Sequence, residues 1–100
     1  MNILAIGAHP DDIEFGCGGT LLRYSAKGNN VYLMILTDGS FGGSVEIRQR
    51  EAVQAAQFLG AEEVFWGGYR DTELVCNREL ILKIDEVLQK VSPEAVFFNF

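Results

Sequence analysis

The chain has 100 residues, 48% of them hydrophobic, a combination that predicts a globular domain and excludes a disordered segment. Its net charge is −6 and its eight Lys and Arg residues are scattered without a run, which argues against nucleic-acid binding. No segment approaches the roughly 20 apolar residues of a membrane span, and the first apolar segment has no basic start. We therefore expect a cytoplasmic protein without membrane contact.

Strand and helix patterns alternate from the start of the chain. Residues 2–8 form a continuous apolar run, typical of a strand buried on both faces of a parallel sheet. Residues 18–27 predict a helix that stops at the turn-forming Gly28, and residues 31–37 predict a second buried strand. The glycine- and serine-rich residues 38–44 predict a loop.

The same alternation continues through the second half. Residues 45–59 place alanines and a leucine on one helical stripe, which predicts a second helix. Residues 63–66 predict a short third strand, followed by a loop over residues 67–76. Asn77 is predicted to cap a third helix, because apolar residues recur behind it at helical spacing until Ser92 and Pro93.

Residues 95–100 complete the pattern as a fourth strand. Four strands that alternate with three helices predict an α/β, three-layer Rossmann-like fold with a parallel sheet and right-handed crossovers. Numbered along the chain, the strands are expected in the order 3-2-1-4. We interpret residues 1–100 as a single Rossmann-like domain.

The chemically richest segment follows the first strand. It contains His9, which is the only histidine of the chain, and the carboxylates Asp11, Asp12 and Glu14. Pro10 keeps the residue before it extended, and in the turn that follows, neighbouring carboxylates project in different directions. One can then bind a metal while the other faces a metal-bound water, the arrangement of a catalytic zinc site. The alternative is that an aspartate only caps the next helix. The position at the carboxyl end of a strand favours the metal site.

This segment resembles the first signature of the LmbE-like or PIG-L-like zinc de-N-acetylases, and the resemblance extends over nearly the whole chain. Its other matching features are glycines 16, 18 and 19 with Thr20, Thr37-Asp38-Gly39, residues 48–51, Leu59-Gly60 and Asp71. The resemblance implies that His9 and Asp12 bind Zn²⁺ and that Asp11 is the general base. It implies a hydrolase in which zinc polarises the N-acetyl amide of an amino-sugar derivative and an activated water attacks it.

Three further residues are candidates for substrate binding. The resemblance implies that Arg48 meets the sugar or an anionic group of the substrate, and that Asp71 lies in the loop after the third strand. Asp38 is a candidate to support His9 or a substrate hydroxyl. The alternatives from the residues alone stay open: Arg48 as a surface residue paired with a nearby glutamate, and the two aspartates as turn formers.

The family completes its zinc site with a histidine from a His-x-x-His type motif after the fourth strand, and this chain has no second histidine. We therefore expect an incomplete zinc site in an amino-terminal fragment of a larger de-N-acetylase domain, with little or no deacetylase activity by itself. One alternative is a non-catalytic Rossmann-like half domain. Another is a receiver- or phosphatase-like magnesium site at Asp11 and Asp12, but the acceptor aspartate and lysine that it needs are not in place.

Two features bear on assembly and redox state. In the order 3-2-1-4, residues 95–100 form an exposed edge strand with three phenylalanines, so we expect a homo-oligomer through the fourth strand. Cys17 and Cys76 are too few and too far apart for a disulfide framework and are expected to stay reduced, Cys17 as a small buried residue.

Overall fold

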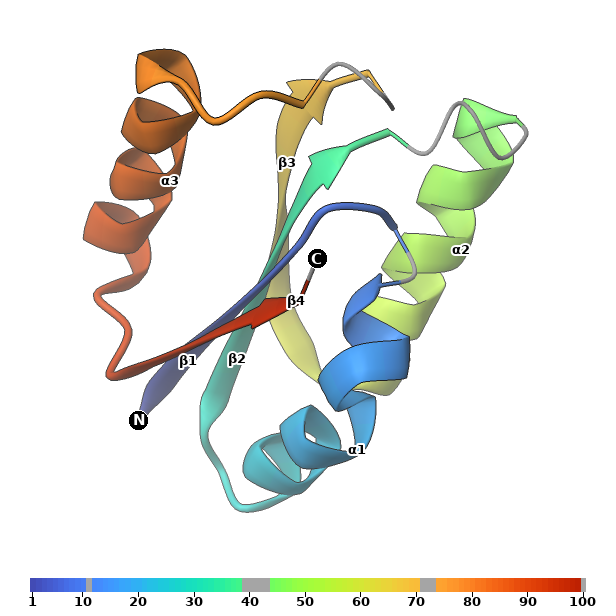
Figure 1. Cartoon of the computed structure of the whole chain (residues 1–100). Coiled ribbons are helices and arrows are strands. Elements are labelled where there is room, and N and C mark those ends of the chain that lie inside the picture. The colour runs from blue at the N-terminus through green and yellow to red at the C-terminus, as the bar shows by residue number, and fades with distance from the viewer. Residues whose placement is uncertain (11, 39–43, 71–73, 100) are drawn as a thin grey trace.

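Residues 1–10, 12–38, 44–70 and 74–99 are described by the computed structural model (Figure 1). The elements in chain order are β1 (Asn2–Gly7), α1 (Asp12–Ala26), β2 (Asn30–Thr37), α2 (Val45–Phe58), β3 (Ala61–Tyr69), α3 (Arg78–Val91) and β4 (Ala95–Asn99). Within this part of the chain, four strands form one parallel sheet in the order β3-β2-β1-β4. The predicted fold class and strand order are thus confirmed.

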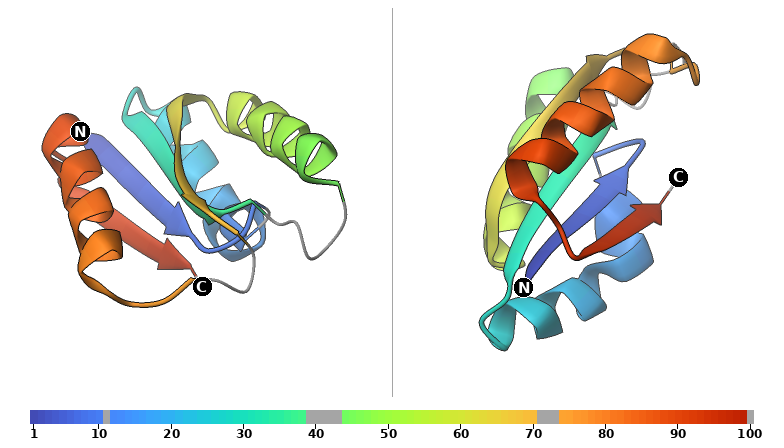
Figure 2. Two further views of the ribbon diagram at one scale, coloured as in Figure 1. Left: turned by 90° about the horizontal axis from the view of Figure 1, so that it is seen from above. Right: turned by 90° about the vertical axis from the view of Figure 1, so that its left-hand side faces the viewer.

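The sheet is the middle of three layers. Helices α1 and α2 cover one of its faces and α3 covers the other (Figure 2). Odd-numbered residues of the central strands, such as Ile3 and Leu33, pack with α1 and α2, whereas even-numbered residues such as Leu4 and Met34 pack with α3. Both central strands are therefore buried on both faces, which explains their continuous apolar sequences.

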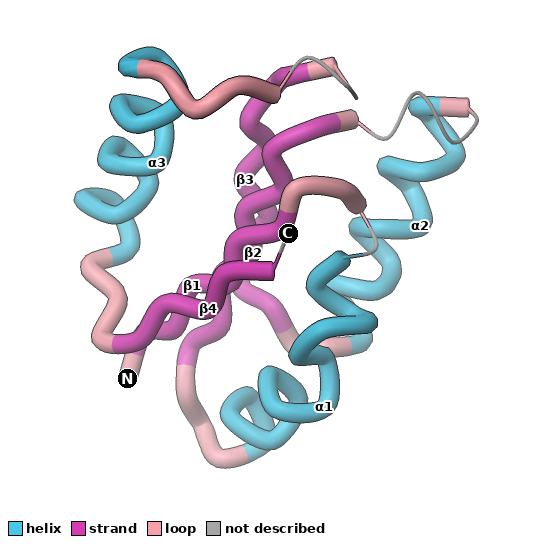
Figure 3. Tube along the Cα trace, in the orientation of Figure 1, coloured by secondary structure: helices cyan, strands magenta, loops and turns pink. Residues whose placement is uncertain are grey.

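Several elements begin or end away from their predicted positions (Figure 3). Helix α1 begins at Asp12, six residues before the predicted start, and includes non-helical backbone angles at Cys17 (φ −143°, ψ 17°), where two helical segments join. Strand β3 extends to Tyr69 through residues that were predicted to form a loop. The first strand ends at Gly7, so His9 lies in a bend instead of continuing the strand.

The glycines of β3 explain why this strand was predicted too short. A Cβ atom at Gly67 would lie 2.7 Å from the backbone oxygen of Leu36, so only glycine allows β2 and β3 to approach this closely. The register between the two strands shifts between Ile35 and Thr37. Gly68 has a positive φ of 84°. Glycines that normally signal a loop here belong to an irregular strand.

The predicted helix signals are largely confirmed. The side chain of Asn77 accepts a hydrogen bond of 3.0 Å from the backbone N–H of Leu80 and caps α3. Ala52, Ala56 and Leu59 are buried on the predicted stripe of the second helix. None of the helices in the described residues is long and apolar enough to cross a membrane.

Candidate metal centre

The parallel arrangement brings the candidate residues to one edge of the sheet. Gly7, the last residue of β1, is level with Ile35 of β2 on one side and with Asn99 of β4 on the other. The segment after β1 therefore leaves the sheet between the carboxyl ends of two neighbouring strands. Rossmann-like proteins bind their ligands at this position, where the direction of strand order reverses. His9 lies in that segment.

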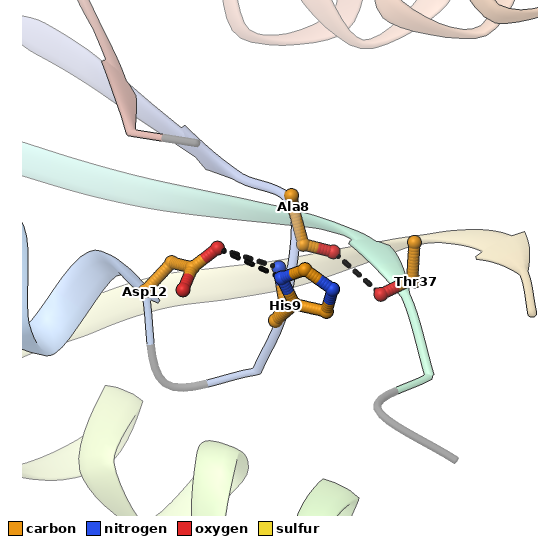
Figure 4. A network of polar contacts seen from close by, with 4 residues as sticks. All are labelled: Ala8, His9, Asp12 and Thr37. Carbon is orange, nitrogen blue, oxygen red and sulfur yellow. Dashed lines mark hydrogen bonds and ion pairs between the residues drawn. The ribbon is translucent and has the colours of Figure 1, made fainter. Parts of the chain in front are cut away.

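His9 and Asp12 form a close pair at this edge (Figure 4). Asp12 is the first residue of α1, and its Oδ2 lies 3.2 Å from Nδ1 of His9. The backbone N–H of His9 donates to the same oxygen at 3.0 Å, and the N–H of Asp12 donates to the carbonyl of His9 at 3.2 Å. The side chains are 42% and 26% exposed, respectively, so the pair is accessible from solvent.

The contact to the backbone N–H resembles a capping box, in which a carboxylate three residues ahead closes the start of a helix. Asp12 thus has part of the alternative role, in which an aspartate caps the helix. It does not compete with metal binding, because a carboxylate has several lone pairs and can serve both functions. Nδ1 of His9 can face this oxygen as an N–H donor or, in the other tautomer, as a nitrogen that shares a metal with it.

The geometry of the pair fits a zinc ion. Two atoms that bind one tetrahedral zinc at about 2.0–2.1 Å lie about 3.3 Å apart, close to the separation of Nδ1 and Oδ2. Imidazole nitrogen and carboxylate oxygen are also ligands that zinc accepts. Within residues 1–10, 12–38, 44–70 and 74–99, His, Cys, Asp and Glu form no group of three or more that could hold a metal. His9 and Asp12 are accordingly two candidate ligands that the described part of the chain brings together.

A second network holds the backbone just before His9. Thr37, the last residue of β2, donates two hydrogen bonds to the carbonyl oxygen of Ala8. One comes from its backbone N–H at 2.8 Å, and the other comes from its hydroxyl Oγ1 at 2.7 Å, which Figure 4 shows. Thr37 is a polar residue in an otherwise apolar core of the described residues, and it is 2% exposed. In the sequence, Thr37 belongs to the matching stretch Thr37-Asp38-Gly39, but it was not predicted to be a site residue.

The remaining predicted residues are placed only in part. Asp38 follows β2 directly, is half-buried, and donates its backbone N–H to the carbonyl of Tyr69 at 3.0 Å, so it belongs to the same edge as His9. Arg48 lies in the first turn of α2, half-buried, where its backbone N–H donates to Ser44 at 3.0 Å. Asp11 and Asp71 lie outside the described residues.

Residues 4–99 match the family of GlcNAc-PI de-N-acetylases, PIG-L. The chain is 34% identical over 97 residues to the uncharacterized deacetylase YaiS of Escherichia coli, in an alignment that covers 94% of this chain and 52% of that protein. It is 35% identical over 103 residues to the diacetylchitobiose deacetylase of Thermococcus kodakarensis, covering 94% and 39% of the two chains.

A solved structure agrees with these alignments. The N,N'-diacetylchitobiose deacetylase from Pyrococcus horikoshii, complexed with its inhibitor MPG, superposes with a TM-score of 0.91 at 35% identity over 95% of this chain and 39% of that one. The chain thus spans about half the length of these relatives or less, and it matches their amino-terminal portion. Sequence match, fold and the position of the His9 segment agree, and the chain belongs to the GlcNAc-PI de-N-acetylase (PIG-L) family.

Proposed function

We propose that this chain supplies the first half of a zinc-dependent de-N-acetylase site that hydrolyses the N-acetyl amide of an amino-sugar derivative. The observation that carries the proposal is the 3.2 Å separation of His9 Nδ1 and Asp12 Oδ2 at the carboxyl edge of the sheet. Two relatives are deacetylases by name, and one of them is a diacetylchitobiose deacetylase. They support deacetylation as the reaction and an N-acetylated amino sugar as the substrate class.

In this proposal His9 and Asp12 are zinc ligands. Zinc, when bound, supplies Lewis acidity toward the amide carbonyl and lowers the pKa of a bound water to about 7. Asp11 accepts the proton of the attacking water as general base. The sugar portion of the substrate is bound by Arg48, Asp38 and Asp71. In the sequence, Asp38 and Asp71 follow β2 and β3, and Arg48 lies in the first turn of α2. These elements frame the same edge of the sheet.

The third zinc ligand is proposed to come from outside residues 1–100. A site with two protein ligands holds zinc weakly and leaves the water poorly oriented, so this chain alone is expected to release little or no acetate from an N-acetylglucosamine derivative. Turnover by these 100 residues that needed both zinc and Asp11 would contradict the incomplete ligand set.

Zinc binding tests the pair directly. Calorimetric titration of the chain with Zn²⁺ is expected to show one weak site, and His9→Ala or Asp12→Asn to weaken it by about 10-fold or more, because each removes one of two ligands. Asp85→Asn is the matched control for Asp12→Asn. Asp85 is an exposed carboxylate on α3, and its replacement changes the net charge by the same amount. Zinc affinity that is the same in all three variants and in the unchanged chain would refute the proposed site.

We also propose that the protein self-associates through β4. Among the strands of the described chain, β4 has a neighbour, β1, on one side only. Its residues Ala95–Asn99 carry no charge, and Val96 and Phe98 are 37% and 58% exposed. An uncharged edge strand with exposed apolar side chains is suited to pairing with a second copy.

A further inference from the structure

We propose that Thr37 is a positioning residue for the His9–Asp12 pair and acts through the peptide group that joins Ala8 to His9. This inference rests on the proposed zinc site, because it assigns a role to Thr37 in holding the two ligands. Thr37 touches neither side chain of the pair in the contacts that define the network. Its effect passes through one backbone amide.

That peptide group is held from both of its ends (Figure 4). Its carbonyl oxygen, on Ala8, accepts the N–H of Thr37 at 2.8 Å and the hydroxyl of Thr37 at 2.7 Å. Its N–H, on His9, donates to Oδ2 of Asp12 at 3.0 Å. The same oxygen lies 3.2 Å from the ring of His9. A continuous series of hydrogen bonds therefore runs from β2 to the two candidate ligands.

The hydroxyl of Thr37 adds a second hydrogen bond to the one that the backbone N–H of Thr37 already donates to Ala8. The ladder between β1 and β2 ends with the pair Gly7 and Ile35, and the N–H of Thr37 extends it by a single bond. The hydroxyl supplies a second donor to the same oxygen, at the point where the chain leaves the sheet. Thr37 and Ala8 are 2% and 6% exposed, so water does not readily replace a lost bond there.

Two physical effects make this second bond relevant to the ligands. A carbonyl that accepts two hydrogen bonds fixes the plane of its peptide group, and this plane sets the direction of the His9 N–H toward Asp12. Hydrogen bonds in series also polarise one another, so the bonds at the Ala8 oxygen strengthen the N–H donor at His9. The branched side chain of Thr37 has few rotamers, which keeps the hydroxyl aimed at Ala8.

Zinc titration of Thr37→Val and Thr37→Ser tests the proposal. Valine has nearly the same shape without the hydroxyl, so Thr37→Val is expected to lower the affinity for Zn²⁺ by about 10-fold, in the range typical of residues that orient metal ligands. Thr37→Ser keeps the donor and is expected to retain most of the affinity. Unchanged affinity in Thr37→Val, or equal losses in the two variants, would overturn the proposal.

A measurement without metal separates this inference from the zinc site itself. Amide hydrogen exchange, followed by NMR in the metal-free protein, is expected to be faster at His9 in Thr37→Val than in Thr37→Ser, relative to core amides such as that of Leu33. Exchange at His9 that changes only in step with the core amides would mean a general loss of stability and would overturn the positioning role. If His9→Ala leaves zinc affinity unchanged, the zinc site fails while this measurement still decides the role of Thr37.

Discussion

The two free cysteines, Cys17 and Cys76, have different surroundings. Cys17 belongs to α1 and is half-buried against the core, and this burial raises the pKa of its thiol above the ordinary range, because desolvation disfavours the thiolate. Cys76 is exposed before α3. Since the thiolate is the reacting species, we expect iodoacetamide to modify Cys17 more slowly than Cys76 near pH 8.

Mass spectrometry of the modified peptides measures both rates in one sample. The rate at Cys17 is expected to keep rising with pH above the ordinary pKa of a thiol, because its thiolate forms only at higher pH. In denaturant the two rates should become equal. Equal rates in the folded protein would contradict the effect of burial on Cys17.

The residues of the candidate site differ in how far the sequence reveals them. The composition of residues 9–14 indicated a metal-binding segment, and the family resemblance singled out His9 and Asp12, whose side chains lie 3.2 Å apart. The role proposed for Thr37 depends on a hydrogen bond to Ala8, 29 residues away, and therefore on the register of two strands. Local sequence carries no signal for that register. Thr37 belongs to the matching stretch Thr37-Asp38-Gly39, but that match gives no contact between Thr37 and Ala8.

The missed element boundaries have a shared cause. Residues 12–17 contain Gly16 and follow the turn expected at Pro10, which disfavoured a helix there, and the glycines at 67 and 68 suggested a loop. In both places tertiary packing overrides the local preference. Ile13 is fully buried under the sheet and anchors the first turn of α1, while Gly67 is buried against the backbone of Leu36. Burial of this kind follows from the assembled sheet and was not visible in a local window.

The junction of β1 and α1 makes one glycine sensitive to substitution. A Cβ atom at Gly7 would lie 2.8 Å from Cγ1 of Ile13, a fully buried branched side chain, and 3.4 Å from Cβ of Asp12. Gly7→Ala is therefore expected to lower the free energy of unfolding by about 1–3 kcal/mol, the usual cost of overpacking a core. Urea denaturation followed by circular dichroism measures this change.

Gly19→Ala, in α1, provides the control. Gly19 is exposed, and apart from its chain neighbours and the nearby backbone of its own helix, no described atom lies within 4 Å of a Cβ built on it. Because alanine has the higher helix propensity, Gly19→Ala is expected to raise the free energy of unfolding by up to about 1 kcal/mol. A loss of stability in Gly19→Ala as large as in Gly7→Ala would show that the packing of α1 on β1 is not the cause.

The two edges of the sheet are protected very differently. On β3, Glu62 and Glu63 are exposed, the register with β2 is irregular, and Nζ of Lys83 donates to the carbonyl of Gly67 at 2.8 Å while lying 4.2 Å from the ring centre of Tyr69. Charges and irregular strands of this kind discourage pairing with another chain. The β4 edge has no charged residue of its own. Of the two edge strands in the described residues, β4 is therefore the one that we propose for self-association.

The side chains of β4 show which substitution tests this. Phe97 packs on the α1 side, where its ring lies 6.3 Å from that of Tyr24, whereas Val96 and Phe98 project from the other face. Two β4 strands that pair around a two-fold axis bring the exposed residues of both copies to the same side of a continuous sheet, with no like charges between them. A lysine at Val96 would place two positive charges in that contact.

Light scattering across a range of protein concentrations decides the question. The unchanged chain is expected to approach twice its 11.1 kDa mass as the concentration rises, and Val96→Lys to stay monomeric. Ile81→Lys is the matched control, because Ile81 is 58% exposed on α3 and the substitution adds the same charge away from the edge. Its mass should follow that of the unchanged chain. If the unchanged chain is a monomer at every concentration, the β4 edge does not pair with a second copy. If dimers persist in Val96→Lys, another surface holds the two copies together. Either result would contradict β4 as the interface.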